Sequence, residues 1–91
     1  MEKSLDKLME DLMKTPGING VLCSDEQGLC LGAKGVAVGQ PAGVISRMAH
    51  QAEQIHPDSG TSPVIVVESE VGNVLIKNHD GITLAIFKSP V

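Results

Sequence analysis

The stretch from Pro63 to Phe87, PVIVVESEVGNVLIKNHDGITLAIF, decides the fold of this 91-residue chain. It contains three short runs rich in β-branched residues, separated by Glu70-Val71-Gly72-Asn73 and Asn78-His79-Asp80-Gly81. Gly and Asn tolerate the positive φ angles of tight turns, so both separators favour hairpin turns. The pattern therefore predicts an antiparallel meander. Its predicted strands are 64–68, 73–77 and 82–87.

These strands are apolar on both faces. Ile65 and Val67 point to one side of the first strand, whereas Val64 and Val66 point to the other, and 74–76 is apolar throughout. An antiparallel sheet with one wet face alternates apolar and polar residues, so a sheet of this composition needs cover on both faces.

The rest of the chain supplies two amphipathic helices and a hairpin. Apolar residues recur at helical spacing in 3–14 and again in 41–56, where Pro41 suits the first helical position. Segments 18–24 and 29–34 read as strands joined by the turn Asp25-Glu26-Gln27-Gly28. The predicted fold class is α/β (α+β), with element order αββαβββ and one five-stranded antiparallel sheet.

Two helices are too few to cover such a sheet. Five strands span about 24 Å, and helices pack about 8–10 Å apart, so full cover needs about two helices on each face. At least one face should therefore stay partly bare in the monomer. Exposed apolar patches of this kind mark protein interfaces, and we expect a domain that is built to associate.

Composition excludes several classes of function. The chain has a net charge of −4, scattered basic residues and a single aromatic residue, Phe87, which argues against nucleic-acid binding. It has 42% hydrophobic and 20% charged residues, as in a globular protein, and its length predicts a single domain over 1–91. No membrane span, signal peptide or lipidation motif is recognisable. A cytoplasmic location is expected, with membrane association only through partners.

Several stretches resemble the roadblock (dynein light chain) family, which has a profilin-like fold with helices on both faces of the sheet. The resemblance covers essentially the whole chain and is strongest to the short roadblock subunits of the Ragulator complex. The stretches that carry it are 16–25 (PGINGVLCSD), 27–29 with 31–32 (QGL, LG), 42–46 (AGVIS) and 79–83 (HDGIT).

The resemblance implies a scaffold and not an enzyme, with no catalytic residue, cofactor or metal. Ragulator acts on the cytosolic face of the lysosome and late endosome, where it recruits Rag GTPases for amino-acid activation of the TOR kinase complex. Roadblock domains pair side by side through the second helix and third strand, with a different subunit or a second copy. Longer family members carry a third helix after the last strand. This chain ends soon after Phe87, so no C-terminal helix is expected, and the resemblance implies that the lipid-anchored Ragulator subunit covers the bare face.

On this sequence the pairing surface would lie on helix 41–56 and strand 64–68. Ala42, Ser46 and Ala49 form a line of small residues on the helix, which would let another helix approach closely. The alternative is that this line packs flat on the chain's own sheet. The predicted partner-binding residues are Ala42, Ile45, Ser46, Ala49, Val64, Val66 and Glu68.

Cys23 and Cys30 flank the first hairpin turn, and their relation depends on the loop. A four-residue loop pairs Cys23 with Cys30, close enough for a disulfide. A three-residue loop with a bulge places them on opposite faces. We expect two reduced cysteines, because the protein should be cytosolic and the spacing is not C-x-x-C.

Other polar patterns have simpler explanations than catalysis. His50 and His56 do not share a helix face as i, i+4 ligands would, and His79 sits in a turn. Gly28, Gly32 and Gly35 match no phosphate-binding motif. Glu68, Glu70 and Asp80 lie at strand ends, where charges meet solvent.

Two other classes of function remain as alternatives. A direct regulator of a small GTPase needs an arginine on a mobile loop, and Arg47, the only arginine, lies inside the second predicted helix. A small-ligand sensor of profilin- or PAS-like fold usually has aromatic pocket walls, which this chain lacks.

Overall fold

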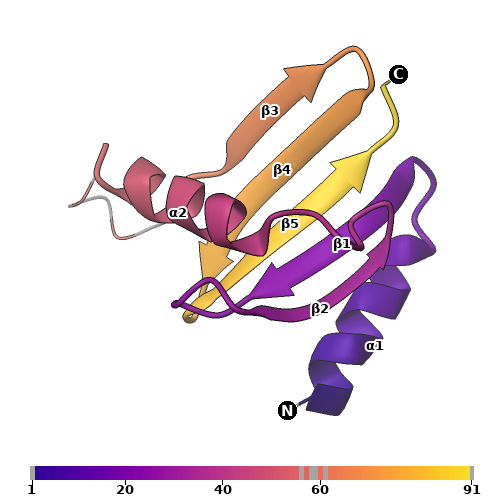
Figure 1. Cartoon of the computed structure of the whole chain (residues 1–91), viewed down its shortest axis with the longest axis horizontal. Coiled ribbons are helices and arrows are strands. Elements are labelled where there is room, and N and C mark those ends of the chain that lie inside the picture. The colour runs from indigo at the N-terminus through magenta and orange to yellow at the C-terminus, as the bar shows by residue number, and fades with distance from the viewer. Residues whose placement is uncertain (1, 56, 58–59, 61, 91) are drawn as a thin grey trace.

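A five-stranded antiparallel sheet with a helix on each face forms the fold (Figure 1). The structure is a computed structural model that describes residues 2–55, 57, 60 and 62–90. Its elements are α1 (Glu2–Met13), β1 (Ile18–Ser24), β2 (Cys30–Gly35), α2 (Ala42–Glu53), β3 (Ile65–Ser69), β4 (Gly72–His79) and β5 (Ile82–Lys88). The predicted element order is confirmed. Most predicted bounds are shifted by one or two residues, α2 ends three residues early, and Val64 precedes its strand instead of lying in it.

The strand order across the sheet is β2-β1-β5-β4-β3. β5 therefore lies at the centre, where it pairs with β1 on one side and with β4 on the other. Val21 of β1 lies opposite Ile86 of β5, which in turn lies opposite Leu75 of β4. The first and last strands thus meet in the middle of the sheet, and β2 and β3 form its two edges.

Tight turns close the predicted meander. His79 pairs with Ile82 across Asp80 and Gly81, whose φ angles are +49° and +79°. Positive φ at both central residues defines a type I′ turn, for which Asp-Gly is a favoured sequence. The other turn holds Glu70 and Val71 between paired Ser69 and Gly72. Asn78, counted as a turn residue from the sequence, belongs to β4 instead, and Asn73 lies in β4 as the predicted strand 73–77 had it.

The first hairpin contains the bulge that was one of the two predicted alternatives. Ser24 pairs with Cys30, but Cys23 pairs with Gly32, because the register shifts between Cys23 and Ser24. The turn is held by Asp25, whose side-chain Oδ1 accepts hydrogen bonds from two backbone N–H groups at 2.9 Å. Cys23 is buried and Cys30 is exposed, and both thiols are free.

The Cys23 thiol should make stability depend on pH in alkaline solution. Burial raises its pKa from 9.0 to about 11, with a smaller contribution from Cys30. Folding thus favours the neutral thiol, so this stabilisation is complete below pH 9 and is lost as the pH rises to about 11. We expect the free energy of unfolding to fall by up to about 2–3 kcal/mol over that range in urea titrations. A Cys23→Ala control should lack this part of the slope, and an equal slope would refute the assignment.

α1 covers one face of the sheet at β1 and β2. Met9 is buried there with Val21 and Cys23. Gly32 of β2 leaves the space that the end of the Met9 side chain fills, since a Cβ would stand 2.6 Å from Met9 Cε. Asp6 Oδ1 lies 3.2 Å from Lys34 Nζ, and the hydrogen bond from Lys34 is the main cause that lowers the pKa of Asp6, ahead of one with Glu10.

The face that α1 covers is partly bare towards β3. Val66 lies on this face, because the register aligns it with Leu75, Ile86 and then Val21 of the α1 cluster. Its side chain is 54% exposed. The expectation that two helices leave part of one face uncovered is therefore confirmed within the described residues. Neither α1 nor α2 has the length and apolar character needed to cross a membrane.

Candidate partner-binding surface

The small-residue line of α2 packs on the chain's own sheet. Four predicted partner-binding residues, Ala42, Ile45, Ser46 and Ala49, are only 3–9% exposed. Ala42, Ile45 and Ala49 share a core with Leu22 of β1, Ile76 of β4 and Ala85 of β5. Ser46 donates a hydrogen bond from Oγ to the backbone oxygen of Asp25 in the first hairpin turn. The structure therefore shows the second alternative for the small-residue line, in which α2 packs against the sheet of the same chain. Because little surface of these side chains is left for a partner, a partner that contacts α2 would meet its other side.

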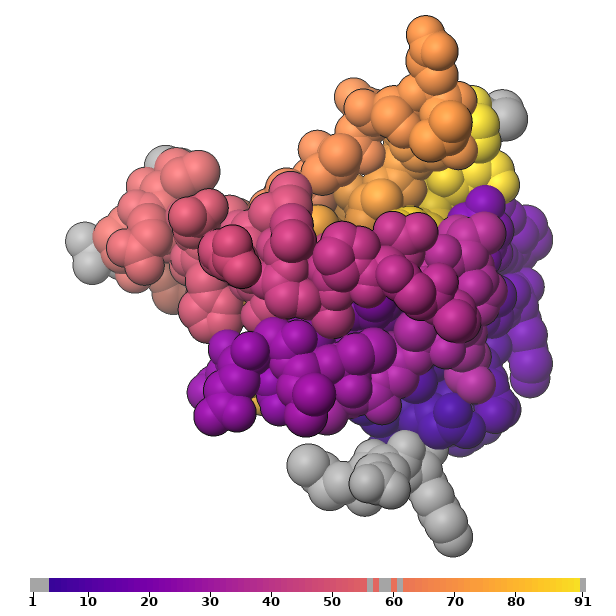
Figure 2. Space-filling model, viewed as in Figure 1, coloured from indigo at the N-terminus to yellow at the C-terminus, as the bar shows by residue number. Residues whose placement is uncertain are grey.

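The outer side of α2 carries a different set of residues. Val44 is 47% exposed and Arg47 is exposed one turn further on. Ile55, just after the helix, is 70% exposed. Figure 2 shows the surface of α2 running across the molecule, with the orange surface of β3 and β4 open beside it.

β3 is an edge strand beside α2. It is hydrogen-bonded to β4 alone and packs against α2. Val66 and Val67 are exposed, and so are Val64, just before the strand, and Glu68. Natural edge strands usually carry protection against pairing, and here Glu68 is the only charge in the strand. We call Val44 of α2 together with Val64, Val66, Val67 and Glu68 at the β3 edge the α2–β3 surface. Val67 lies on the sheet face that α2 covers, whereas Val66 and Glu68 lie on the face that α1 covers.

A second group of exposed apolar residues lies on β2 and in the loops at its two ends. Leu29 and Leu31 flank Cys30 at the start of β2, and Val36 and Val38 follow its end. Because β2 and β3 are the two outermost strands, Leu29 and Leu31 are separate from the α2–β3 surface. Val36 lies over β1, where its Cγ2 would stand 2.8 Å from a Cβ on Gly20. Leu31 offers a matched position for control substitutions.

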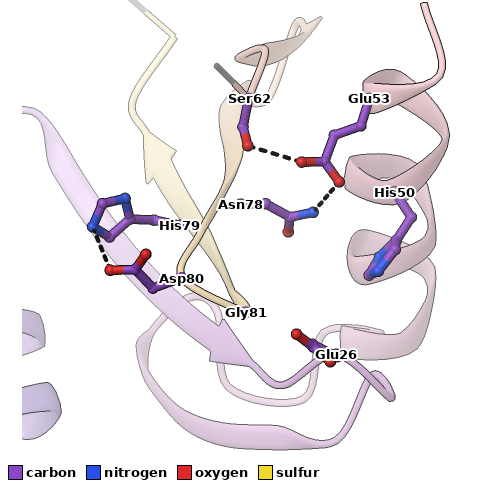
Figure 3. A pocket seen from close by; sticks show the side chains of 8 residues that line it. All are labelled: Glu26, His50, Glu53, Ser62, Asn78, His79, Asp80 and Gly81. Atoms are coloured by element: carbon purple, nitrogen blue, oxygen red, sulfur yellow. Dashed lines mark hydrogen bonds and ion pairs between the residues drawn. The ribbon is translucent and has the colours of Figure 1, made fainter. Parts of the chain in front are cut away.

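A cluster of hydrogen-bonded polar side chains connects the end of α2 with β4 and with the residues just before β3 (Figure 3). Glu53 accepts hydrogen bonds from Ser62 Oγ at 2.8 Å and from Asn78 Nδ2 at 3.0 Å. The bond from Ser62 is the larger cause, and that from Asn78 the smaller, of the lowered pKa of Glu53. Sequence reasoning missed this cluster, because its members lie 9 and 25 positions apart and share no motif.

A small polar pocket of about 190 Å³ opens beside the cluster. Binding sites for small molecules are usually larger and mainly apolar, which gives the ligand-sensor alternative no support. The residues around the pocket are Glu26, His50, Glu53, Ser62, Asn78, His79, Asp80 and Gly81.

The histidines make local contacts. His50 Nδ1 lies 3.1 Å from the backbone oxygen of Ser46, and His79 Nε2 lies 3.3 Å from Asp80 Oδ2 at the surface. His56 falls outside the described residues. Within the described ranges, no three His, Cys, Asp or Glu side chains converge as a metal site would require.

The remaining polar patterns are spread over the fold. Glu68 and Glu70 sit at one end of β4 and Asp80 at the other, so these carboxylates do not form a pair. Gly28 lies in the first hairpin turn with φ +86°. Arg47 is part of the regular helix α2, whereas a regulatory arginine of a GTPase activator is placed by a mobile loop.

Comparison with known protein families matches residues 1–88 to the family described as "Ragulator complex protein LAMTOR5". The protein of that name from Xenopus laevis is 44% identical over 88 residues, which span 97% of both chains. A "LAMTOR5 homolog" from Nematostella vectensis is 43% identical over 90 residues, 99% of both chains, and one from Dictyostelium discoideum is 33% identical over 90 residues, 99% of this chain and all of that one.

Solved structures agree on the fold. A Roadblock/LC7 domain from Streptomyces avermitilis superposes with a TM-score of 0.76 at 20% identity, over 93% of this chain and 78% of the other. MglB from Myxococcus xanthus superposes with a TM-score of 0.79 at 12% identity, over 97% of this chain and 71% of the other. At such low identities these similarities establish the roadblock fold alone.

Proposed function

This chain belongs to the LAMTOR5 family of non-enzymatic Ragulator subunits, which includes the hepatitis B virus X-interacting protein, and from that membership we propose that it works as a scaffold. It pairs with another roadblock-domain subunit inside a Ragulator-like complex on the cytosolic face of the lysosome. The complex helps to recruit Rag GTPases for amino-acid activation of TOR kinase signalling. The chain contributes shape and contact surface, and it catalyses no step.

The single observation that carries the proposal is the α2–β3 surface. An edge strand with exposed valines and little charge favours the addition of a partner strand, which would extend the sheet. Val44 on the neighbouring outer side of α2 is nearly half exposed, so a partner helix would bury more apolar area beside the strands. Pairing would remove from water the groups that the monomer leaves open.

We further propose a second contact on the face that α1 partly covers. Val66, Leu75 and Ile86 form an apolar row across β3, β4 and β5 on this face. An extended segment of the lipid-anchored Ragulator subunit would cover this row and hold the chain at the membrane. This arrangement needs no membrane-spanning helix in the chain itself.

Val67→Arg is expected to reduce pairing with a roadblock subunit by at least about 100-fold. The substitution places a cation at the edge strand, where pairing would desolvate it; 100-fold corresponds to about 2.7 kcal/mol. The chain is measured alone and co-purified with the other roadblock subunits of Ragulator, by sedimentation velocity at micromolar concentration. Leu31→Arg, at a position 45% exposed on the opposite edge strand β2, serves as the matched control and should pair normally.

Two outcomes would contradict the proposal. If Val67→Arg and Leu31→Arg weaken pairing equally, the contact does not depend on the α2–β3 surface. If the wild-type chain pairs with neither a second copy nor any other roadblock subunit, the scaffold function by roadblock pairing is wrong.

A further inference from the structure

We propose that Glu53 is a positioning residue for the α2–β3 surface, because its carboxylate fixes the start of β3 relative to the end of α2. The inference rests on the proposed pairing function and adds to it the group that prepares the surface for a partner. Glu53 is the last residue of α2. Its carboxylate binds two other segments of the chain (Figure 3).

Each oxygen of the carboxylate has its own donor. Oε2 accepts from the hydroxyl of Ser62, which precedes β3, at 2.8 Å, and Oε1 accepts from the amide of Asn78 in β4 at 3.0 Å. Hydrogen bonds to an ionised carboxylate are stronger than those between neutral groups. One side chain thereby joins the end of α2, the approach to β3, and β4.

The orientation of Asn78 is itself determined by a neighbour. Thr83 of β5 donates a short hydrogen bond from Oγ1 to Asn78 Oδ1. Thr83 is only 1% exposed, so its hydroxyl is held by the surrounding core. Because Oδ1 accepts this bond, the Nδ2 group is the one that faces Glu53. The anchor therefore extends from the exposed end of α2 to the buried centre of the sheet.

This anchor bears on partner binding because it holds the two halves of the α2–β3 surface together. Between α2 and β3 the chain has no further regular element among the residues that the structure describes. A strand edge whose start is not fixed must be ordered when a partner binds, and that ordering reduces affinity. Glu53 makes no part of the partner contact itself, and it acts by ordering the surface in advance.

Asn78→Asp tests the anchor most directly. The new carboxylate can still accept the hydrogen bond from Thr83, but it faces Glu53 with a second negative charge in place of a donor. We expect affinity for the roadblock partner in the sedimentation assay to fall about tenfold. The double variant Glu53→Gln with Asn78→Asp restores an amide facing a carboxylate with the roles exchanged, and it should return affinity to within about twofold of wild type.

A second readout and a milder variant keep the test independent of folding. Amide hydrogen exchange at 64–66 in the isolated chain should speed up in Asn78→Asp and recover in the double variant. Ser62→Ala removes one donor without adding charge, and it should weaken pairing by about threefold.

The results separate this inference from the proposed function. If Asn78→Asp is folded and pairs as well as wild type, or if the double variant fails to recover, Glu53 is not a positioning residue, although pairing through the α2–β3 surface stands. If the wild-type chain does not pair at all, the proposed function fails and this inference fails with it.

Discussion

Ala49→Arg should remove about half or more of the chain's free energy of unfolding at 25 °C. Ala49 is 3% exposed and packs in one cluster with Leu22, Ile76 and Ala85. An arginine there would either bury an unpaired charge or push α2 off the sheet, and both cost more than about 4 kcal/mol. A domain of this size has about 5–10 kcal/mol of stability in total. Far-ultraviolet circular dichroism with urea titration would measure the loss.

The control for this variant lies on the same helix. Val44→Arg adds the same side chain at a position that is 47% exposed. Its free energy of unfolding should therefore lie within about 0.5 kcal/mol of the wild-type value. If Ala49→Arg is as stable as Val44→Arg and fails only in pairing, Ala49 faces a partner, and the observed packing of α2 on its own sheet would be wrong.

Gly35→Ala should cost about 2–4 kcal/mol, the next largest effect of a single substitution. Gly35 ends β2 with φ +64°, which L side chains rarely adopt, and a Cβ there would clash with the backbone oxygen of Asn19. That oxygen also accepts a hydrogen bond from the N–H of Val36 at 3.0 Å. The backbone at Asn19 cannot move away from the new Cβ without losing this hydrogen bond. The urea concentration at the midpoint of unfolding should therefore fall clearly.

Gly39→Ala separates the two causes of this cost. Gly39 has φ +87°, but nothing lies within 4 Å of a Cβ built on it. Its substitution should therefore cost only the conformational strain, about 1 kcal/mol. Equal losses at Gly35 and Gly39 would show that the contact with Asn19 contributes nothing.

The strands and the order of elements followed from local patterns in the sequence. The Asp80-Gly81 turn needs only residues that accept positive φ, and such signals are complete within a few positions. The bare sheet face also followed, because it depends on the number of helices and strands and not on their contacts. The bulge at Cys23 remained one of two options, since loop length alone does not fix register.

The partner-facing side of α2 could not be assigned from sequence, and the residues predicted for it on α2 lie buried in the chain; their partner role stays a prediction. Small residues at Ala42, Ser46 and Ala49 suit close approach by any neighbour, and periodicity does not distinguish the own sheet from a partner. The Glu53 cluster was equally hidden, because it joins side chains that come together only after the sheet has formed. A partner role for the exposed Val64, Val66 and Glu68 stays a prediction.

The central place of β5 has a consequence for how the chain folds during synthesis. β1 and β2 can form one hairpin and β3 and β4 another, but within the sheet β5 is the one strand that joins them. Isolated two-stranded hairpins are marginal in water. The growing chain must therefore keep both halves of its core open until the last strand leaves the ribosome. Closing a contact of such high sequence separation slows folding and prolongs the exposure of apolar segments. Assembly with other subunits can begin only after this last step, so the newly made chain should depend on chaperones in the interval.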